Sequence, residues 1–123
     1  LENALCVYSN ARGLEDLFSE GEVSSVIAFF PDPWNKKKGQ LHNRLFDKAF
    51  LEMLKQVLKP GGVFWFKTDC LNYFQFVKKL AKELNFKSLS QRPFPQVVGL
   101  SVFEERFKQQ KIPTYEAYWT NNA

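Results

Sequence analysis

Short apolar runs alternate along this chain with longer stretches whose apolar residues recur every three or four positions, and this alternation constrains the fold most. Residues 25–30 and 63–66 are β-prone runs, and the first of them ends at Pro31. Between them, residues 45–58 repeat at helical spacing. Strands that alternate with helices form βαβ units. The sequence therefore predicts an α/β fold with a mostly parallel sheet, as one domain over residues 1–123.

Weaker signals place the remaining elements. We expect strands at residues 5–8, 86–90 and 114–119, and helices over 14–18, over 71–84 and from Ser101. The breakers Lys59-Pro60-Gly61-Gly62 should end the helix over 45–58, and Thr68-Asp69 offers a cap to the next helix. Because ligands bind beyond the carboxyl ends of parallel strands, the loops after residues 30 and 67 are the places to look for chemistry.

Cysteine usage and charge bound the environment of the protein. Cys6 and Cys70 lie far apart and offer no metal-ligand spacing, which favours free thiols in a reducing, cytoplasmic compartment. The longest apolar run is too short to cross a bilayer, and no leader is visible. A net charge of +4 permits nucleic-acid binding without arguing for it. The chain begins with Leu1 and not with a methionine, so we expect a fragment.

The loop after residue 30 reads Pro31-Asp32-Pro33-Trp34-Asn35 and continues into three lysines, Lys36, Lys37 and Lys38. One interpretation is a tight turn with a packed indole and a solvated basic face. The other is a rigidly held carboxylate and indole, placed where a planar base could stack and hydrogen-bond. In that case the lysines and Arg44 would contact the phosphates of RNA.

Asp69 follows the next predicted strand, where it could cap the following helix or share a cleft with Asp32. Neighbouring strands lie about 4.8 Å apart, so carboxylates at their ends could face one substrate. Guanine presents N1–H and an exocyclic amine as adjacent donors, which one carboxylate accepts together. Ser101 and Glu104 fit a capping box at the start of a helix. His42 has no visible partner for a catalytic triad.

Taken together, these motifs resemble the tRNA (guanine-N7-)-methyltransferase family of class I S-adenosylmethionine-dependent enzymes. The resemblance covers most of the chain. Pro-Asp-Pro-Trp followed by lysines is close to diagnostic, whereas Leu-Lys-Pro-Gly-Gly recurs in many class I methyltransferases. The matching segments, in order, are Pro31-Asp32-Pro33-Trp34 with Lys36-Lys37-Lys38, Leu58-Lys59-Pro60-Gly61-Gly62, Thr68-Asp69 and Ser101-Val102-Phe103-Glu104.

The resemblance implies a partial Rossmann-like fold, with a mostly parallel sheet and an antiparallel C-terminal strand. It also implies methyl transfer from S-adenosylmethionine to N7 of a guanine in the variable loop of tRNA. Asp32 matches the family's catalytic, cofactor-proximal aspartate, and Asn10 and Ala11 match the pair near the adenine. No metal is implied. Ser101 stands where the family usually has threonine, and residues 39–44 are less basic and one residue longer than usual. The expected tRNA-binding residues are Trp34, Lys36, Lys37, Lys38, Arg44, Asp69, Ser101 and Glu104.

The family's glycine-rich cofactor loop would precede the first residue of this chain. We therefore expect the C-terminal portion of a methyltransferase domain, inactive alone and binding the cofactor weakly. The family's sheet order, 3-2-1-4-5-7-6, makes residues 5–8 the third strand and residues 25–30 the fourth, with a free edge that should pair with a missing N-terminal half or a second copy. Two alternatives stay open: an exocyclic-amine nucleic-acid methyltransferase, and a non-catalytic RNA-binding or assembly fragment.

Overall fold

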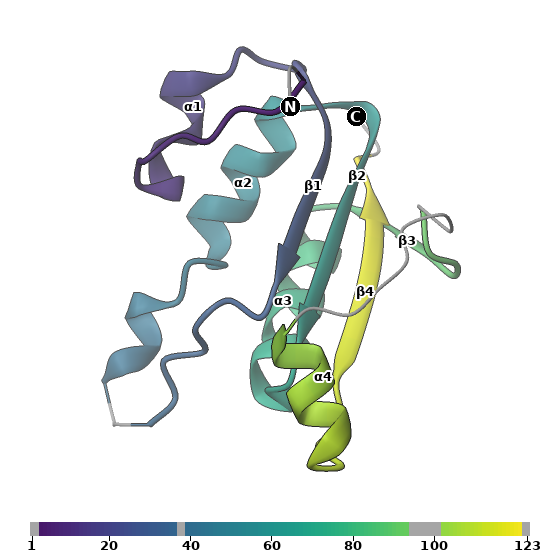
Figure 1. The fold of residues 1–123 in the computed structure, drawn as a ribbon. Helices are drawn as coiled ribbons and strands as arrows, with labels where there is room; N and C mark the ends of the chain where they lie inside the picture. The colour runs from purple at the N-terminus through teal and green to yellow at the C-terminus, as the bar shows by residue number, and fades with distance from the viewer. Residues whose placement is uncertain (1–2, 37–38, 94–101, 122–123) are drawn as a thin grey trace.

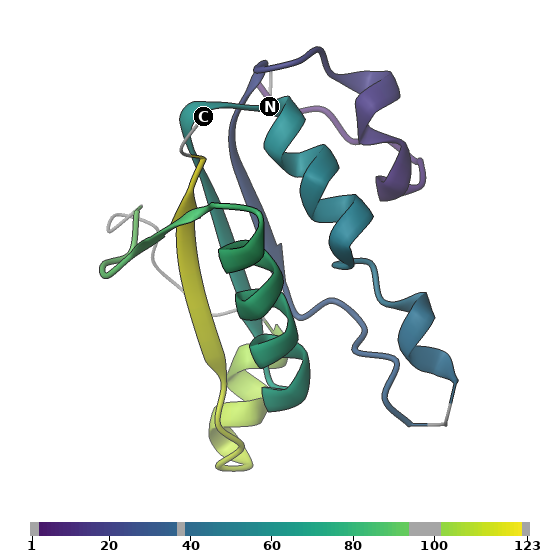
Figure 2. The same ribbon diagram turned by 180° about the vertical axis from the view of Figure 1, so that it is seen from behind.

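A four-stranded mixed sheet with helices on both faces organises the computed structural model, which describes residues 3–36, 39–93 and 102–121. Helices α2 and α3 cover one face, and α4 lies against the other face at one end (Figures 1 and 2). None of the helices in these ranges is long and apolar enough to span a membrane. The elements, in chain order, are η1 (Ala11–Gly13), α1 (Leu14–Leu17), β1 (Val23–Phe29), η2 (Gln40–Asn43), α2 (Lys48–Val57), β2 (Leu58–Thr68), α3 (Leu71–Glu83), β3 (Lys87–Leu89), α4 (Val102–Gln109) and β4 (Tyr115–Thr120).

The core lies between the sheet and the pair α2 and α3. Asp47 caps α2 by accepting a hydrogen bond from the backbone N–H of Phe50 at 2.9 Å. The apolar stripe of α2 then faces β2, and Phe46 stacks against Phe64 with ring centroids 5.5 Å apart. The buried side chains of this layer are Phe46, Phe50, Leu51, Met53, Leu54, Leu58, Phe64, Phe66, Tyr73, Val77, Leu80, Ala81, Phe86 and Trp119.

Helix α2 ends earlier than its breakers suggested. Its last residue is Val57, and Leu58 already belongs to β2, so Pro60 and the two glycines lie inside the strand. Gly61 has a φ of 78°, which a side chain would strain, and a Cβ on Gly62 would come within 2.8 Å of the Lys59 carbonyl oxygen. The glycines therefore permit a sharp irregularity inside β2, where its register with β1 shifts between Val23 and Ser25.

The strand order β1-β2-β4-β3 matches the 4-5-7-6 half of the order that the resemblance implied. The α/β class is confirmed, and so is the antiparallel C-terminal strand: β1 and β2 are parallel, whereas β4 pairs antiparallel with both β2 and β3. In the parallel pair Phe29 lies opposite Lys67. The carboxyl ends of β1 and β2 therefore lie side by side at the same end of the sheet, and the two candidate loops begin there.

Residues 5–8 form no strand in the structure, contrary to the sequence-based expectation. Leu5, Val7 and Tyr8 are 88%, 56% and 108% exposed. A β-prone run needs a neighbouring strand for its hydrogen bonds, and no described strand lies beyond β1. The following residues behave as expected, since Leu14–Leu17 forms a single helical turn beside α2.

Candidate functional site

The loop after β1 is a tight turn with two residues in the left-handed region of backbone space. Phe30 has a φ of 56° and Trp34 a φ of 49°. Asp32 Oδ1 accepts a hydrogen bond from the backbone N–H of Trp34 at 3.0 Å, which closes an Asx turn. Two prolines flank Asp32 and restrict its neighbours further. The sequence thus builds a rigid loop that presents Asp32 at the edge of the sheet.

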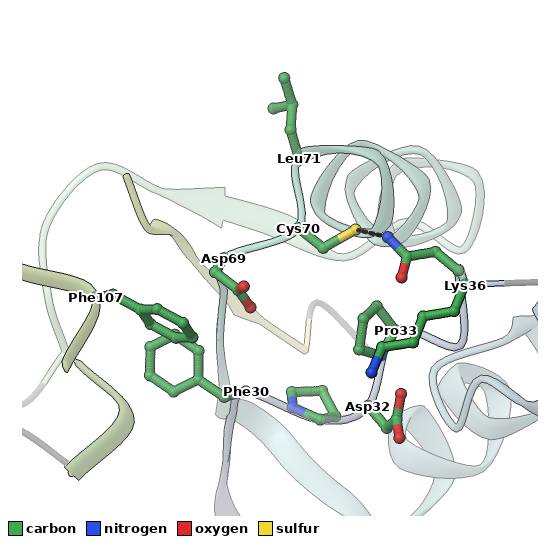
Figure 3. A pocket seen from close by; sticks show the side chains of 10 residues that line it. Phe30, Asp32, Pro33, Lys36, Asp69, Cys70, Leu71 and Phe107 are labelled. Atoms are coloured by element: carbon green, nitrogen blue, oxygen red, sulfur yellow. Dashed lines mark hydrogen bonds between the residues drawn. The ribbon is translucent and has the colours of Figure 1, made fainter. Parts of the chain in front are cut away.

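This loop borders a pocket of about 790 Å³ (Figure 3). Asp32 and Asp69 both line it, as the sequence predicted from two neighbouring strands, and Figure 3 shows their carboxylates on separate sides of the hollow. The full lining consists of Phe30, Pro31, Asp32, Pro33, Asn35, Lys36, Asp69, Cys70, Leu71 and Phe107. A planar ligand entering here would meet two carboxylates, one lysine and several apolar surfaces.

Asp69 is not the cap of the helix that follows it. The N-cap of α3 is Cys70, which makes no side-chain capping bond, while Thr68 Oγ1 accepts from the N–H of Cys70 at 3.1 Å. Asn35 Nδ2 donates to Cys70 Sγ at 3.4 Å and joins the two loops across the pocket. Because α3 does not use the Asp69 carboxylate as its cap, that carboxylate is available to a ligand.

Aromatic rings form one wall of the pocket. The ring centroids of Phe30 and Phe107 are 5.3 Å apart. Phe107 belongs to α4, which lies on the sheet face opposite α2 and α3. Four of the lining residues were not predicted from the sequence: Phe30, Cys70, Leu71 and Phe107. Phe107 could have been found from its spacing, since it lies one helical turn after Glu104 and shares its helix face.

Trp34 and Lys36 differ in their relation to the pocket. Trp34 is 37% exposed and is not among the residues that line the pocket, although it belongs to the same turn. Lys36 lines the pocket with an exposed side chain. Lys37, Lys38 and Ser101 lie outside the described residues. Of the three lysines in this loop, Lys36 is the one that the described residues place at the pocket.

Arg44 departs from the expected phosphate contact because the residue is only 3% exposed. Its Nε donates to the carbonyl oxygen of Pro33 at 2.6 Å, and one Nη donates to Asn72 Oδ1 at 3.1 Å. The guanidinium carbon lies 4.6 Å from the centre of the Tyr73 ring. Burial raises the pKa of Tyr73 to about 12, despite opposing contributions that include the nearby guanidinium.

Glu104 is also engaged within the protein. Its Oε1 lies 2.8 Å from Lys67 Nζ, and the two side chains are only 14% and 6% exposed. Glu116 Oε2 is 3.7 Å from the same ammonium group. Lys67 was not singled out from the sequence, where it follows a strand-like run without any sign of burial. Glu104 does not line the pocket that holds Asp32 and Asp69.

Asn10 and Ala11 lie apart from that pocket, beside a second hollow of about 280 Å³. Its other lining residues are mostly apolar: Leu5, Val7, Ser9, Leu14, Leu17 and Phe18. Asn10 Oδ1 accepts from the backbone N–H of Arg12 at 3.0 Å, and this bond begins η1. Arg12 in turn donates to the carbonyl oxygen of Arg44 at 2.8 Å and so connects the two regions.

The sequence matches a protein family described as "putative methyltransferase" over residues 1–117. It is 32% identical over 122 residues to the tRNA (guanine-N(7)-)-methyltransferase of Wolinella succinogenes, covering 99% of this chain and 31% of the relative. It is 38% identical over 118 residues to the protein of the same name from Bacillus licheniformis, covering 89% of this chain and 54% of the relative. The chain thus spans about a third to a half of these relatives.

Two solved structures share the fold. One is a crystal structure described as a "putative DNA modification methylase" from Thermus thermophilus, with a TM-score of 0.58 and 13% identity, covering 93% of this chain and 51% of that one. The other is a SAM-dependent methyltransferase from Archaeoglobus fulgidus, with a TM-score of 0.52 and 11% identity, covering 93% and 66%. At these identities the likeness concerns the fold alone, which is that of part of a Rossmann-like methyltransferase.

Proposed function

The chain belongs to the family described as putative methyltransferases, and we propose that it forms the substrate side of an S-adenosylmethionine-dependent tRNA (guanine-N7-)-methyltransferase. The names of the curated relatives support this reaction. The structural observation that carries it is the position of Asp32 and Asp69, which come from neighbouring parallel strands and line one pocket. Two rigidly placed acceptors suit a base with adjacent donors.

Recognition of guanine is assigned to Asp69. A carboxylate can accept the N1–H and the exocyclic amine of guanine at once, and adenine offers no such pair of donors. The rings of Phe30 and Phe107 form an apolar wall on which a purine can pack. In this arrangement the purine would lie between Asp69 and Asp32, with its Watson–Crick edge toward Asp69 and the Asp32 carboxylate beside the ring.

Methyl transfer to N7 requires no general base, because N7 has an in-plane lone pair and no proton to lose. Alignment of the reacting atoms can supply several kcal/mol of the barrier by removing orientational freedom. Positive charge moves to the purine as the new bond forms, and the Asp32 carboxylate beside the ring stabilises it. Asp32 therefore orients the base and acts electrostatically. It transfers no proton in this scheme.

The cofactor would be held by Asn10 and Ala11 at its adenine and by Asp32 near its reactive end. The hollow beside Asn10 has the apolar lining that an adenine ring needs, with one amide at its margin. When bound, S-adenosylmethionine supplies the electrophilic methyl group. The residues described here fit one part of such a cofactor, and the remainder of the site would come from a segment outside this chain.

The tRNA backbone would be held by the lysines of the loop. Lys36 borders the pocket, and Lys37 and Lys38 follow it in sequence. Trp34 is exposed beside the pocket and is assigned to a neighbouring base of the tRNA. Ser101 and Glu104 are proposed to contact tRNA by resemblance, with Glu104 acting while paired to Lys67. Because tRNA is the proposed substrate, we also propose a cytoplasmic location for the protein.

The free edge of β1 is proposed as the surface where the methyltransferase domain is completed. Within the described sheet β1 pairs with β2 alone, and Ile27 on the strand is 48% exposed. Unpaired strand edges attract further strands. We assign this edge to a strand of a longer chain, which fits the greater length of the relatives.

The test uses the longest protein that the reading frame encodes. It is incubated with tRNA and methyl-labelled S-adenosylmethionine, and the digested nucleosides are separated. The label is expected in 7-methylguanosine and is expected to be lost when the guanine of the variable loop is replaced by adenine. Label in an N6-methylated adenine would contradict the proposal in favour of exocyclic-amine transfer. RNA binding without any label would favour a non-catalytic module.

A further inference from the structure

One peptide group in the Asp32 loop has both of its hydrogen-bonding atoms taken by side chains. This peptide joins Pro33 to Trp34. Its carbonyl oxygen accepts from Arg44 Nε at 2.6 Å, and its N–H donates to Asp32 Oδ1 at 3.0 Å. Because a peptide group is planar, the two bonds together fix its orientation. The bond to Asp32 also holds its carboxylate, and the orientation of the peptide sets the backbone from which the Trp34 side chain leaves.

Arg44 is itself held in place from several sides. Its guanidinium lies over Tyr73 at 4.6 Å and Phe76 at 5.7 Å, and it donates to Asn72 Oδ1 at 3.1 Å. A guanidinium is a planar fork, so these contacts set the direction of its Nε–H as well. All three partners lie on α3, and the first residues of α3 border the same pocket as Asp32. Arg44 thus ties the loop to the helix.

The backbone of this loop needs such support. Trp34 has a φ of 49°, in a region that residues with a Cβ adopt at a cost. Conformations of this kind persist where the surroundings impose them, and they cluster at functional sites. The bond from Arg44 to the preceding carbonyl oxygen opposes relaxation of this peptide, together with the bond from the Trp34 N–H to Asp32.

We propose that Arg44 is a positioning residue that sets the orientation of Asp32 and Trp34 from inside the protein, without contacting the tRNA. The inference deepens the proposed function and rests on it for its link to methyl transfer. It replaces the phosphate contact expected from the sequence, because the guanidinium is buried and already hydrogen-bonded twice. The effect of Arg44 on the loop can be tested without measuring methyl transfer.

The first measurement is fluorine NMR of the longest protein that the reading frame encodes, labelled with 5-fluorotryptophan. The chain has three tryptophans, and Trp34→Phe assigns the resonance of Trp34. Arg44→Gln and Asn72→Ala are expected to shift and broaden this resonance and to leave those of Trp65 and Trp119 in place. Lys48→Gln, an exposed position on α2, is the control. A Trp34 resonance unchanged in both variants overturns the proposal.

Asn72 keeps this test decisive if Arg44→Gln fails to fold. Misfolding would collapse the resonances of Trp65 and Trp119, which report the buried sheet. Asn72 is an exposed residue whose amide touches the guanidinium, so its replacement loosens Arg44 without opening the core. In that case the Asn72→Ala spectrum alone decides, and a Trp34 resonance identical to the parent protein overturns the proposal.

The second measurement separates positioning from phosphate contact. If Arg44 contacted a phosphate, Arg44→Gln would reduce the slope of log affinity against log salt by about 0.7 to 0.9. We expect that slope to be unchanged for Arg44→Gln and reduced by this amount for Lys36→Gln. A reduced slope for Arg44→Gln overturns the proposal. If the protein does not methylate guanine N7, the proposed function fails, while the fluorine measurement still decides on Arg44.

Discussion

Lys67 Nζ lies 2.8 Å from Glu104 Oε1, and this ion pair fastens α4 to the sheet face opposite α2 and α3. The ammonium group also lies 4.7 Å from the centre of the Phe29 ring. Helix α4 carries Phe107, which borders the pocket, so the pair stabilises one wall of the candidate site. Removing one partner of a largely buried ion pair destabilises the fold when it leaves the other charge without a counter-charge.

Removing Lys67 and removing Glu104 should lower the free energy of unfolding by different amounts. Lys67→Met leaves the carboxylates of Glu104 and Glu116 without their shared ammonium, and we expect a loss of about 3 kcal/mol in the free energy of unfolding. Glu104→Gln leaves Lys67 within 3.7 Å of Glu116, so we expect about 1 kcal/mol. Urea unfolding measures both. Equal losses, or a larger loss for Glu104→Gln, would contradict this account.

Glu116 should make the protein sensitive to acid. Burial raises the pKa of Glu116, but hydrogen bonds from Arg92, Tyr118 and Trp65 and the charge of Lys67 outweigh it, so the pKa lies below its ordinary value of 4.5. A carboxyl with a lowered folded-state pKa stabilises the fold above its unfolded-state pKa, and this stability is lost as the pH falls through the folded-state value.

Removing the Glu116 carboxyl should therefore change how the stability of the protein depends on pH. Glu116→Gln is expected to be less stable than the parent near neutral pH, and the difference should shrink as the pH falls from about 5 to about 2. Thermal unfolding across this range measures the difference. Glu52→Gln, an exposed position on α2, is the control. A constant difference between parent and Glu116→Gln over the whole range would show that the carboxyl does not titrate as described.

The pocket could be predicted from the sequence because it follows from topology. Two apolar runs, which are followed by Pro31 and Thr68, become neighbouring parallel strands, and carboxylates just beyond them come to the same end of the sheet. The resemblance added the order of the described strands, which short runs alone do not specify. These inferences depend on local pattern and on connection rules, and both can be read from one sequence.

The burial of Arg44 and Lys67 could not be predicted in this way. Each is a cation beside a basic or polar segment, and its burial depends on partners distant in the sequence, such as Tyr73 for Arg44 and Glu104 for Lys67. Residues 5–8 failed for the opposite reason. Their β-propensity is real, but a strand exists only where a neighbour accepts its hydrogen bonds.

Asp32→Asn tests whether the carboxylate acts through its charge. The amide keeps an oxygen that can accept from the N–H of Trp34, so the loop should hold its shape. Turnover of the complete enzyme is expected to fall about 100-fold, while tRNA affinity stays within about twofold of the parent. The measurement is turnover and tRNA binding against pH. A pH-rate profile whose pKa vanishes in Asp32→Asn would assign a proton-transfer role to Asp32 and contradict the electrostatic one.

The exposed edge of β1 should dominate the behaviour of the 123-residue chain in solution. Ile27 is 48% exposed beside this edge, and Leu5 and Val7 are exposed as well, so we expect self-association through it together with weak binding of S-adenosylmethionine. Analytical ultracentrifugation and cofactor titration measure the two properties. Ile27→Lys places a charge beside the edge and should shift the chain toward monomer, whereas Leu41→Lys, an equally exposed position on η2, should not. A monomer that binds the cofactor tightly would show that the chain needs no further strand to complete its site.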